Sequence, residues 1–299
     1  MSLPADGIFS GKHVVVFGCG YVGAEAARQA VAGGARVTAL TRNEAKADAL
    51  RAGGVEVVVA DLASDAWHGR LAGGADWVLN CVSSGGGGIE GYRHSYVAGM
   101  GSVVAWAKAR GPVGTIVYTG STSVYPQGEG VVVGETAPTD GSGERPRILL
   151  EAENLLRAND GATARWFVLR LAGIYGPGRH HLLEQVRAGE VAGRGDYRLN
   201  LIYRDDIVAG IWAAFGAEAD VANGVFNLAD DGAASKAAMA GWLAARLVVP
   251  EPRFTGEPAS GRRAVTPDRV IANAKAKAVL GWRPAFPSFR EGYEKILSR

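Results

Sequence analysis

The chain has 299 residues, enough for one large two-lobed domain or two modest domains with a sizeable buried core. Its 32 lysines and arginines and 30 aspartates and glutamates leave a formal charge of +2, which gives no reason to expect nucleic acid or an anionic membrane as the main partner. Hydrophobic residues make up 47% and charged residues 21%, which is typical of a folded domain and excludes an intrinsically disordered chain.

Targeting and metal-binding signals are missing from the sequence. The longest stretch without a charged residue or histidine, 111–128, is rich in glycine, serine and threonine and contains prolines, so it does not predict a membrane span. The N-terminal sequence MSLPADGIFSGKH has no basic or apolar region of a secretory signal, and we expect a cytoplasmic protein. Cys19 and Cys81 are too few for a disulfide framework, and the adjacent His180 and His181 do not present two ligands on one helical face. We therefore expect no metal.

Short apolar runs alternate with helix-length segments through the first part of the chain. This alternation predicts parallel strands joined by right-handed helical crossovers, that is, an α/β doubly wound sheet. After Tyr175 the elements become shorter and prolines more frequent, which indicates a smaller lobe. The expected strands are 13–17, 36–40, 55–60, 77–82, 115–119 and 165–171, and the expected helices are 21–32, 44–52, 96–109 and 151–159.

Glycine is unusually frequent, with 43 residues, or about twice its ordinary share. No three-residue glycine period exists, which excludes a collagen-like chain. The segment 18–23, GCGYVG, matches the dinucleotide fingerprint G-x-G-x-x-G, but at this glycine content about one match is expected by chance. A second match indeed occurs at Gly86, Gly88 and Gly91, inside a glycine run that we interpret as a mobile loop near the ligand.

The position of the first match distinguishes it from the second. It follows the first strand and opens a helix within a βαβ unit, as a dinucleotide site requires; the alternative is a purely structural turn. Gly18 would permit the tight turn, Gly20 the approach of the pyrophosphate, and Gly23 close packing of helix and strand, while the helix N-terminus would supply N–H groups for the phosphates. The predicted cofactor-binding residues of this turn and of the end of the fourth strand are Gly18, Cys19, Gly20, Tyr21, Val22, Gly23, Cys81, Val82 and Ser83.

Two further positions bear on the choice of cofactor. The second strand ends in Thr41 and Arg42, where an NAD-preferring site usually carries an acidic residue for the ribose hydroxyls. A guanidinium there would pair with a 2′-phosphate, so NADP is favoured while NAD stays possible; a solvated arginine is the alternative. Asp61 and Leu62, after the third strand, are placed to meet the adenine ring, although Asp61 is equally suited to cap the helical segment that starts at Ala63.

Five stretches carry a resemblance to a known family, and they span nearly the whole chain in the family's order. They are GCGYVG at 18–23 with Thr41-Arg42, VYTGSTSVY at 117–125, RLAGIYGPG at 170–178, NLIYRDDI at 200–207 and LGWRP at 280–284. On these stretches the sequence resembles the extended short-chain dehydrogenase/reductases, the NAD-dependent epimerase/dehydratase group, as an atypical branch. The resemblance implies a dinucleotide-binding Rossmann domain over residues 10–175, to which 200–230 returns, and a smaller substrate-binding lobe over 176–299.

The resemblance also implies a catalytic pattern that this chain keeps only in part. Ser121 matches the Ser or Thr that hydrogen-bonds the substrate oxygen, with Thr122 beside it. The family's Tyr-x-x-x-Lys couple aligns with Arg145 and Leu149; no tyrosine occurs between residues 125 and 175, and no lysine between 108 and 236. A phenol has a pKa of about 10 and needs a nearby cation to act as an acid or base near neutral pH. The couple is therefore expected to be absent.

Other groups are weaker candidates for its role. The glycine loop is followed by Tyr92, His94 and Tyr96, and Tyr175 is expected to line the substrate lobe. The alternative for each is a structural role, as a tyrosine that packs or a histidine exposed to solvent. Arg145 or Arg147 would place a cation near the ribose or the substrate but would not release a proton. Asp205 and Asp206 resemble a pair of acids, but this segment is structural in the family pattern. The resemblance also implies that the stretch with Arg179, Arg194 and Arg198 borders the substrate, where these cations would suit an anionic ligand; the alternative is that they are surface charges.

Two functional hypotheses follow. The first is an NAD(P)-binding oxidoreductase or epimerase-like enzyme, with NADP favoured, acting on a small molecule that is anionic or a nucleotide sugar. The second is a catalytically inactive NAD(P)-binding sensor or regulatory protein. A methyltransferase-like α/β domain is disfavoured by the motifs at 175–178 and 280–282. An apolar face with Val103, Trp106 and Ala107 would suit either a homodimer or core packing.

Overall fold

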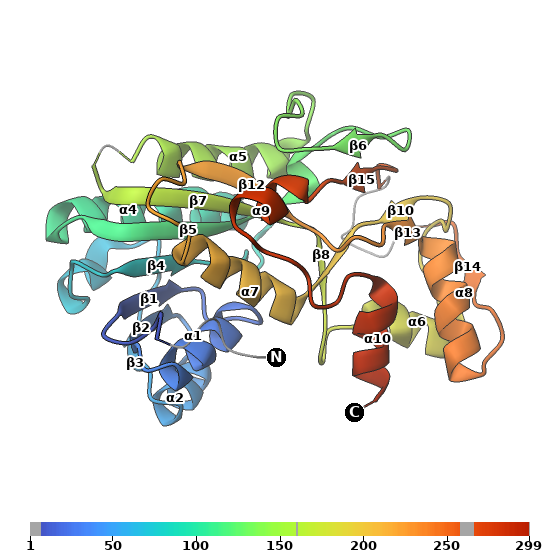
Figure 1. Ribbon diagram of the computed structural model, residues 1–299, viewed down its shortest axis with the longest axis horizontal. Coiled ribbons are helices and arrows are strands. Elements are labelled where there is room, and N and C mark those ends of the chain that lie inside the picture. The colour runs from blue at the N-terminus through green and yellow to red at the C-terminus, as the bar shows by residue number, and fades with distance from the viewer. Residues whose placement is uncertain (1–6, 160, 258–265, 299) are drawn as a thin grey trace.

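The computed structural model describes residues 7–159, 161–257 and 266–298. Seven strands form a central sheet in the order β12-β7-β5-β4-β1-β2-β3, and every neighbouring pair is parallel (Figure 1). The strands are β1 (His13–Phe17), β2 (Arg36–Thr41), β3 (Glu56–Val59), β4 (Trp77–Asn80), β5 (Val113–Ser121), β7 (Thr163–Leu171) and β12 (Gly224–Leu228). The predicted doubly wound α/β sheet is confirmed.

Alternate side chains of the buried strands face the two sides of the sheet, because successive residues of a strand point in opposite directions. In β1, Val14 and Val16 join the core that packs against the helices α1 and α7, whereas Val15 and Phe17 join the core against α4. Both faces are covered, so these strands read as continuous apolar runs. The main helices are α1 (Gly23–Ala32), α2 (Glu44–Ala52), α4 (Gly99–Arg110), α5 (Glu144–Arg157) and α7 (Arg204–Phe215).

The face of α4 that suggested a dimer is occupied within the chain. Val103, Trp106 and Ala107 are fully buried, and Trp106 packs against Phe17 and Trp67. These side chains belong to the core of their own domain and are not available to a partner.

Several element bounds differ from the expected ones. The helix expected from residue 96 is preceded by α3 (Gly88–Arg93) and a π-helical turn, η2 (His94–Ala98), while the helix expected from 151 begins at Glu144. Pro146 lies in the first turn of α5, where its missing N–H leaves no hydrogen bond unmade. Other short elements near the site are the 3₁₀ turns η1 (Asp65–Arg70) and η3 (Thr122–Val124).

The C-terminal part of the chain packs beside the carboxyl end of the sheet (Figure 1). Its own core contains Leu183, Tyr203, Leu243 and Phe289 from separate elements. Its strands are short and pair two by two: β8 (Gly173–Tyr175) with β11 (Leu201–Tyr203), β10 (Arg198–Leu199) with β13 (Ala234–Ser235), and β9 (Glu190–Val191) with β14 (Arg253–Phe254). Its last strand, β15 (Val270–Ile271), pairs with β6 (Val132–Val133), which lies between β5 and α5 in the first part of the chain. Its helices are α6 (His181–Arg187), α8 (Lys236–Leu247), α9 (Ala274–Val279) and α10 (Phe289–Leu297).

The division into 10–175 and 176–299 stays a prediction, but one segment of the second part contributes to the main sheet. Strand β12 pairs with β7, so residues 200–230 supply an edge strand, and α7 packs on the sheet beside α1. Within the described residues, no helix combines the length and apolar character needed to cross a lipid bilayer.

Candidate functional site

The glycine turn between β1 and α1 is built for close backbone approach. Gly18 has φ +91°, and a β-carbon there would lie 2.6 Å from the amide nitrogen of Val82. At Gly23 a β-carbon would lie 2.5 Å from Cys81 Sγ. The first and third glycines of the turn therefore let it pack directly on the residues that follow β4, as the fingerprint predicts.

This turn has donors to spare for an anion. In the described part of the chain, the backbone N–H groups of Tyr21 and Val22 donate to no protein acceptor. They lie just before the first turn of α1, where the helix dipole is positive. The turn also lies at the edge between β1 and β4, where the strand order reverses and where open α/β sheets bind ligands. These features fit a dinucleotide pyrophosphate.

The residues expected at the adenosine end lie near one another. Arg42 follows β2, and its guanidinium lies directly beside the Gly85 backbone, in the space that a β-carbon at Gly85 would occupy. Asp61 accepts hydrogen bonds from the Ala63 backbone, at 3.0 Å, and from His94, whose Nε2 lies 2.8 Å from Asp61 Oδ2. Although burial alone would raise the pKa of Asp61, these hydrogen bonds and the charge of Arg42 lower it.

Three other predicted cofactor residues, Leu62, Cys81 and Cys19, are buried or partly buried and carry no charge at neutral pH. Leu62 is buried in the core on the α4 side of the sheet, and Cys81 Sγ lies 3.0 Å from the carbonyl oxygen of Gly18. Burial raises the pKa of the Cys19 thiol to about 12 and that of Cys81 well above its usual range. Neither cysteine is a thiolate at neutral pH, and among the described residues no three metal-ligating side chains converge.

Ser121 lies at the carboxyl end of β5 and lines a cavity of about 880 Å³. Its hydroxyl oxygen accepts a hydrogen bond from the Ser123 backbone at 3.1 Å, which leaves the hydroxyl proton to donate. Thr122 also lines the cavity, but its hydroxyl donates to the Leu171 carbonyl at 3.2 Å. Ser121 is thus the better placed of the two to contact a substrate oxygen.

Tyr175 also borders this cavity, in surroundings that disfavour proton release. Only 3% of it is exposed, its hydroxyl donates to the Ser288 carbonyl at 3.4 Å, and its ring packs against Tyr203 and Tyr293. Burial and the neighbouring Asp230 carboxyl raise its pKa far above the usual range. The geometry favours a packing role for Tyr175, and catalysis by it stays an untested prediction.

The positions that align with the family's Tyr–Lys couple hold other side chains. On α5, Arg145 lies over the ring of Tyr92, with its guanidinium carbon 5.5 Å from the ring centroid, and Leu149 is buried. The rings of Tyr92 and Tyr96 pack together, with their centroids 4.8 Å apart, and the Tyr96 hydroxyl accepts a hydrogen bond from the Ser84 backbone N–H. Burial raises the pKa of Tyr96 to about 12, so it does not release its proton near neutral pH.

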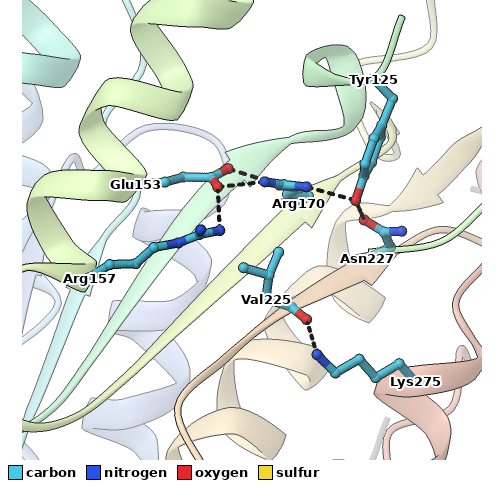
Figure 2. A network of polar contacts seen from close by, with 7 residues as sticks. All are labelled: Tyr125, Glu153, Arg157, Arg170, Val225, Asn227 and Lys275. Atoms are coloured by element: carbon cyan, nitrogen blue, oxygen red, sulfur yellow. Dashed lines mark hydrogen bonds and ion pairs between the residues drawn. The ribbon is translucent and has the colours of Figure 1, made fainter. Parts of the chain in front are cut away.

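A buried ion pair beneath this region was not foreseen from the sequence. Glu153 on α5 and Arg170 on β7 form two hydrogen bonds, at 2.9 and 2.7 Å, and both side chains are at most 3% exposed (Figure 2). Arg170 also donates to the Tyr125 hydroxyl, which in turn donates to Asn227 on β12, each at 2.9 Å. The network connects the segment after Ser121 to one helix, α5, and two strands of the sheet, β7 and β12. Arg170 and Tyr125 are motif residues, but their spacing gives no sign of Glu153 as the partner.

The cations that line the cavity differ in what they contact. Arg194 pairs with Asp196, and Arg198 pairs with Asp268 at 2.8 Å. Arg179 lines the same cavity and has no carboxylate within ion-pair distance among the residues that the structure describes. Of the three arginines expected near the substrate, it alone keeps its charge unpaired.

Comparison with known proteins places these features in a family. The profile of the NAD-dependent epimerase/dehydratase family matches residues 14–229, which include the glycine turn, Ser121 and the Arg170–Gly178 motif. The chain belongs to this family. The match ends before Arg269, which lines the cavity and donates to the Tyr125 carbonyl at 2.7 Å, so the C-terminal wall of the cavity lies outside the family's matched region.

Three individual proteins are similar over most of their length. Protein YeeZ of Escherichia coli K12 is 26% identical over 282 residues, which cover 92% of this chain and 97% of that protein. The structure of MoeE5 in complex with UDP-glucose and NAD has a TM-score of 0.81 at 21% identity, covering 96% of this chain and 97% of the other. The UDP-glucuronic acid 4-epimerase from Bacillus cereus, in complex with NAD, has a TM-score of 0.77 at 17% identity, covering 96% and 99%. At these identities the structures establish the shared fold.

Proposed function

We propose that the chain is an NAD(P)-binding oxidoreductase or epimerase-like protein of the epimerase/dehydratase family, with NADP favoured as the cofactor. It would act on a small molecule, and its mechanism would not use the family's Tyr–Lys couple. One observation carries the proposal. The glycine turn, whose N–H groups at Tyr21 and Val22 have no acceptor within the described residues, follows β1, and Ser121, whose hydroxyl proton is available, ends β5. These two strands flank β4 in the sheet. Parallel strands bring their carboxyl ends to one edge, so a dinucleotide in the turn and a substrate in the cavity would meet there.

The proposed roles are divided among the residues of this edge. The N–H groups of Tyr21 and Val22 would hold the pyrophosphate, and Arg42 would pair with a 2′-phosphate. A nicotinamide supplies the hydride chemistry when it is bound. Ser121 would orient the reacting oxygen of the substrate by donating a hydrogen bond to it. The solved relatives named with UDP-sugars support a nucleotide-linked or otherwise anionic substrate as the class to test first.

A second candidate is a protein that binds the dinucleotide without turnover, as a sensor or regulatory partner. It is favoured by Arg145 and Leu149 at the positions aligned with the couple, since neither side chain transfers a proton near neutral pH. Broad screening with carbonyl compounds and sugar nucleotides separates the two candidates. Hydride transfer to any of them rejects the binding-only candidate.

The Ser121→Ala variant tests the serine-centred role. We expect turnover to fall by about 10²-fold, the usual effect of losing one donor to a developing oxyanion, with dinucleotide binding unchanged. Ser298→Ala, at the exposed end of α10, is the matched control and should behave as the wild type. Equal turnover in Ser121→Ala and the control would exclude this serine from the mechanism.

A further inference from the structure

The side chain of Tyr21 leaves the glycine turn and contacts the segment that leads into the cavity. Its hydroxyl donates to the Pro177 carbonyl at 3.0 Å. A β-carbon at Gly176 would lie 2.7 Å from the Tyr21 hydroxyl oxygen, so this approach depends on glycine at that position. The turn expected to hold the cofactor is therefore fastened to residues 176–179, which follow β8.

Two guanidinium groups lie over the Tyr21 ring. The guanidinium carbon of Arg179 is 5.6 Å and that of Arg204 is 5.3 Å from the ring centroid, within the range of cation–π attraction. They differ in their other contacts. Arg204 is paired with Asp205 at 2.8 Å, whereas Arg179 has no carboxylate partner among the described residues. The Tyr21 ring thus supports one cation that is paired with a carboxylate and one, Arg179, that is unpaired within the described residues and belongs to a residue lining the cavity.

We infer that Arg179 binds an anionic group of the substrate, phosphoryl or carboxylate, and that Tyr21 is the positioning residue that makes this binding cooperative with that of the dinucleotide. The inference rests on the proposed function, and it adds the residue that recognises the anionic group and a connection between the two sites. Arg179 presents a planar fork of donors that matches either anion.

The connection has a simple physical basis. A pyrophosphate held by the backbone of Tyr21 and Val22 would restrict the turn and with it the Tyr21 ring. The ring is the support of the Arg179 guanidinium, so restricting it lowers the entropy that Arg179 loses when it binds an anion. Linkage requires the reverse effect to be equally large, and coupling of this kind is typically about 5- to 150-fold in affinity.

The first experiment measures the charge that Arg179 recognises. Calorimetric titration of the full chain uses uridine, UDP, UDP-glucose and UDP-glucuronic acid as probes, each with and without saturating NADP. We expect Arg179→Gln to lose about 10- to 100-fold in affinity for a charged probe, and nothing for uridine. If Arg179→Gln binds UDP and both UDP-sugars more weakly than the wild type does, Arg179 contacts a phosphoryl group. If only the affinity for UDP-glucuronic acid falls, Arg179 contacts the sugar carboxylate. Arg187→Gln, an exposed arginine of α6 outside the cavity lining, removes the same charge and is the control.

The second experiment measures the role of Tyr21 through the ratio of the affinity for a charged probe with NADP to the affinity without it. A general loss of stability would not change this ratio. In the wild type we expect NADP to tighten the binding of the charged probe at least about 5-fold. Tyr21→Leu removes the ring and should bring this ratio to about 1, while Tyr21→Phe keeps the ring and should retain most of it. Thermal unfolding of each variant shows that it is folded.

The inference is overturned if Arg179→Gln binds every probe as the wild type does, if no charged probe binds the wild type, or if the ratio is unchanged in Tyr21→Leu. Weaker NADP binding by Arg179→Gln with unchanged probe binding would also contradict it, because the arginine would then serve the cofactor. Each of these results leaves NADP binding by the wild type intact. The proposed function fails differently, by an absence of dinucleotide binding.

Discussion

At the scale of single residues, the proposed preference for NADP over NAD depends on Arg42. An arginine that pairs with a 2′-phosphate contributes a charge-assisted hydrogen bond of about 1.5 to 3 kcal/mol. We therefore expect Arg42→Ala to weaken NADPH binding by about 10- to 100-fold and to leave NADH binding unchanged. Arg51→Ala, an exposed arginine of α2, is the control. Equal losses for the two dinucleotides would mean that Arg42 does not recognise the 2′-phosphate.

Asp230 is a buried carboxyl with an incomplete set of partners. Its Oδ1 accepts one hydrogen bond, from the Gly232 backbone at 3.2 Å, whereas Oδ2 has no partner in the described chain. Burial raises the pKa of Asp230 to about 8, and burial likewise raises that of Asp206 to about 6. Between about pH 4 and pH 8, Asp230 is therefore protonated in the folded state but ionised in the unfolded state. Its contribution to the free energy of unfolding falls as the pH rises through this range.

The Asp230→Asn variant removes this dependence while keeping the shape of the side chain. We expect its stability relative to the wild type to increase between pH 5 and pH 9 by on the order of 1 to 3 kcal/mol, measured by urea unfolding. The neighbouring Asp231→Asn is the control. Although burial opposes it, hydrogen bonds from Lys277 and Asn273 lower the pKa of Asp231, so its effect is constant across this range. A stability difference for Asp230→Asn that does not change with pH would contradict the assignment.

Sequence reasoning anticipates single residues of the site better than their partners. Ser121 and the glycines of the turn follow from motifs at the ends of predicted strands, and the structure places them there. Glu153 and Arg170 are 17 residues apart in the sequence, and Tyr21 and Pro177 are 156 residues apart. No local pattern encodes such contacts, because they depend on how whole elements pack.

At the scale of elements, helix α8 ends in a strained residue. Val248 has φ +56° and ψ +46°, a left-handed conformation that costs a β-branched side chain about 1 to 2 kcal/mol, and the side chain is almost fully exposed. We expect Val248→Gly to stabilise the protein by about 1 kcal/mol in urea unfolding. Val132→Gly, an exposed valine in the extended strand β6, is the matched control and should give no gain. Equal effects of the two substitutions would show that the cap is not strained.

The elements of the sheet could be predicted because each of its first six strands is an apolar run followed by a helical segment or a loop. Strand β5 is longer than expected, over Val113–Ser121, since it continues through polar residues that pair with β7. The elements α3 and η2 lie in a glycine-rich stretch without clear helical periodicity, and they were not predicted as separate elements. Pairs such as β6 with β15 have only two residues in each strand, too few for a repeating pattern, and their partners lie far apart in sequence.

At the scale of the whole molecule, the two parts of the chain contact each other both at the glycine turn and at the cavity. Arg269, from the C-terminal part, donates to the Thr122 carbonyl at 3.0 Å just beyond Ser121, while Tyr21 contacts Pro177 from the other side. Ligands at the two sites would therefore act on one connected structure. This arrangement depends on the sheet order, which brings the ends of β1 and β5 to the same edge.

The claim on which the whole account depends is that the first glycine turn binds a dinucleotide, and a thermal shift with NADPH and NADH side by side tests it most directly. A ligand present at about one hundred times its dissociation constant adds about 2.7 kcal/mol, which raises the unfolding midpoint by several degrees. We predict a clear rise with NADPH and a smaller one, or none, with NADH. No rise with either dinucleotide would contradict the account.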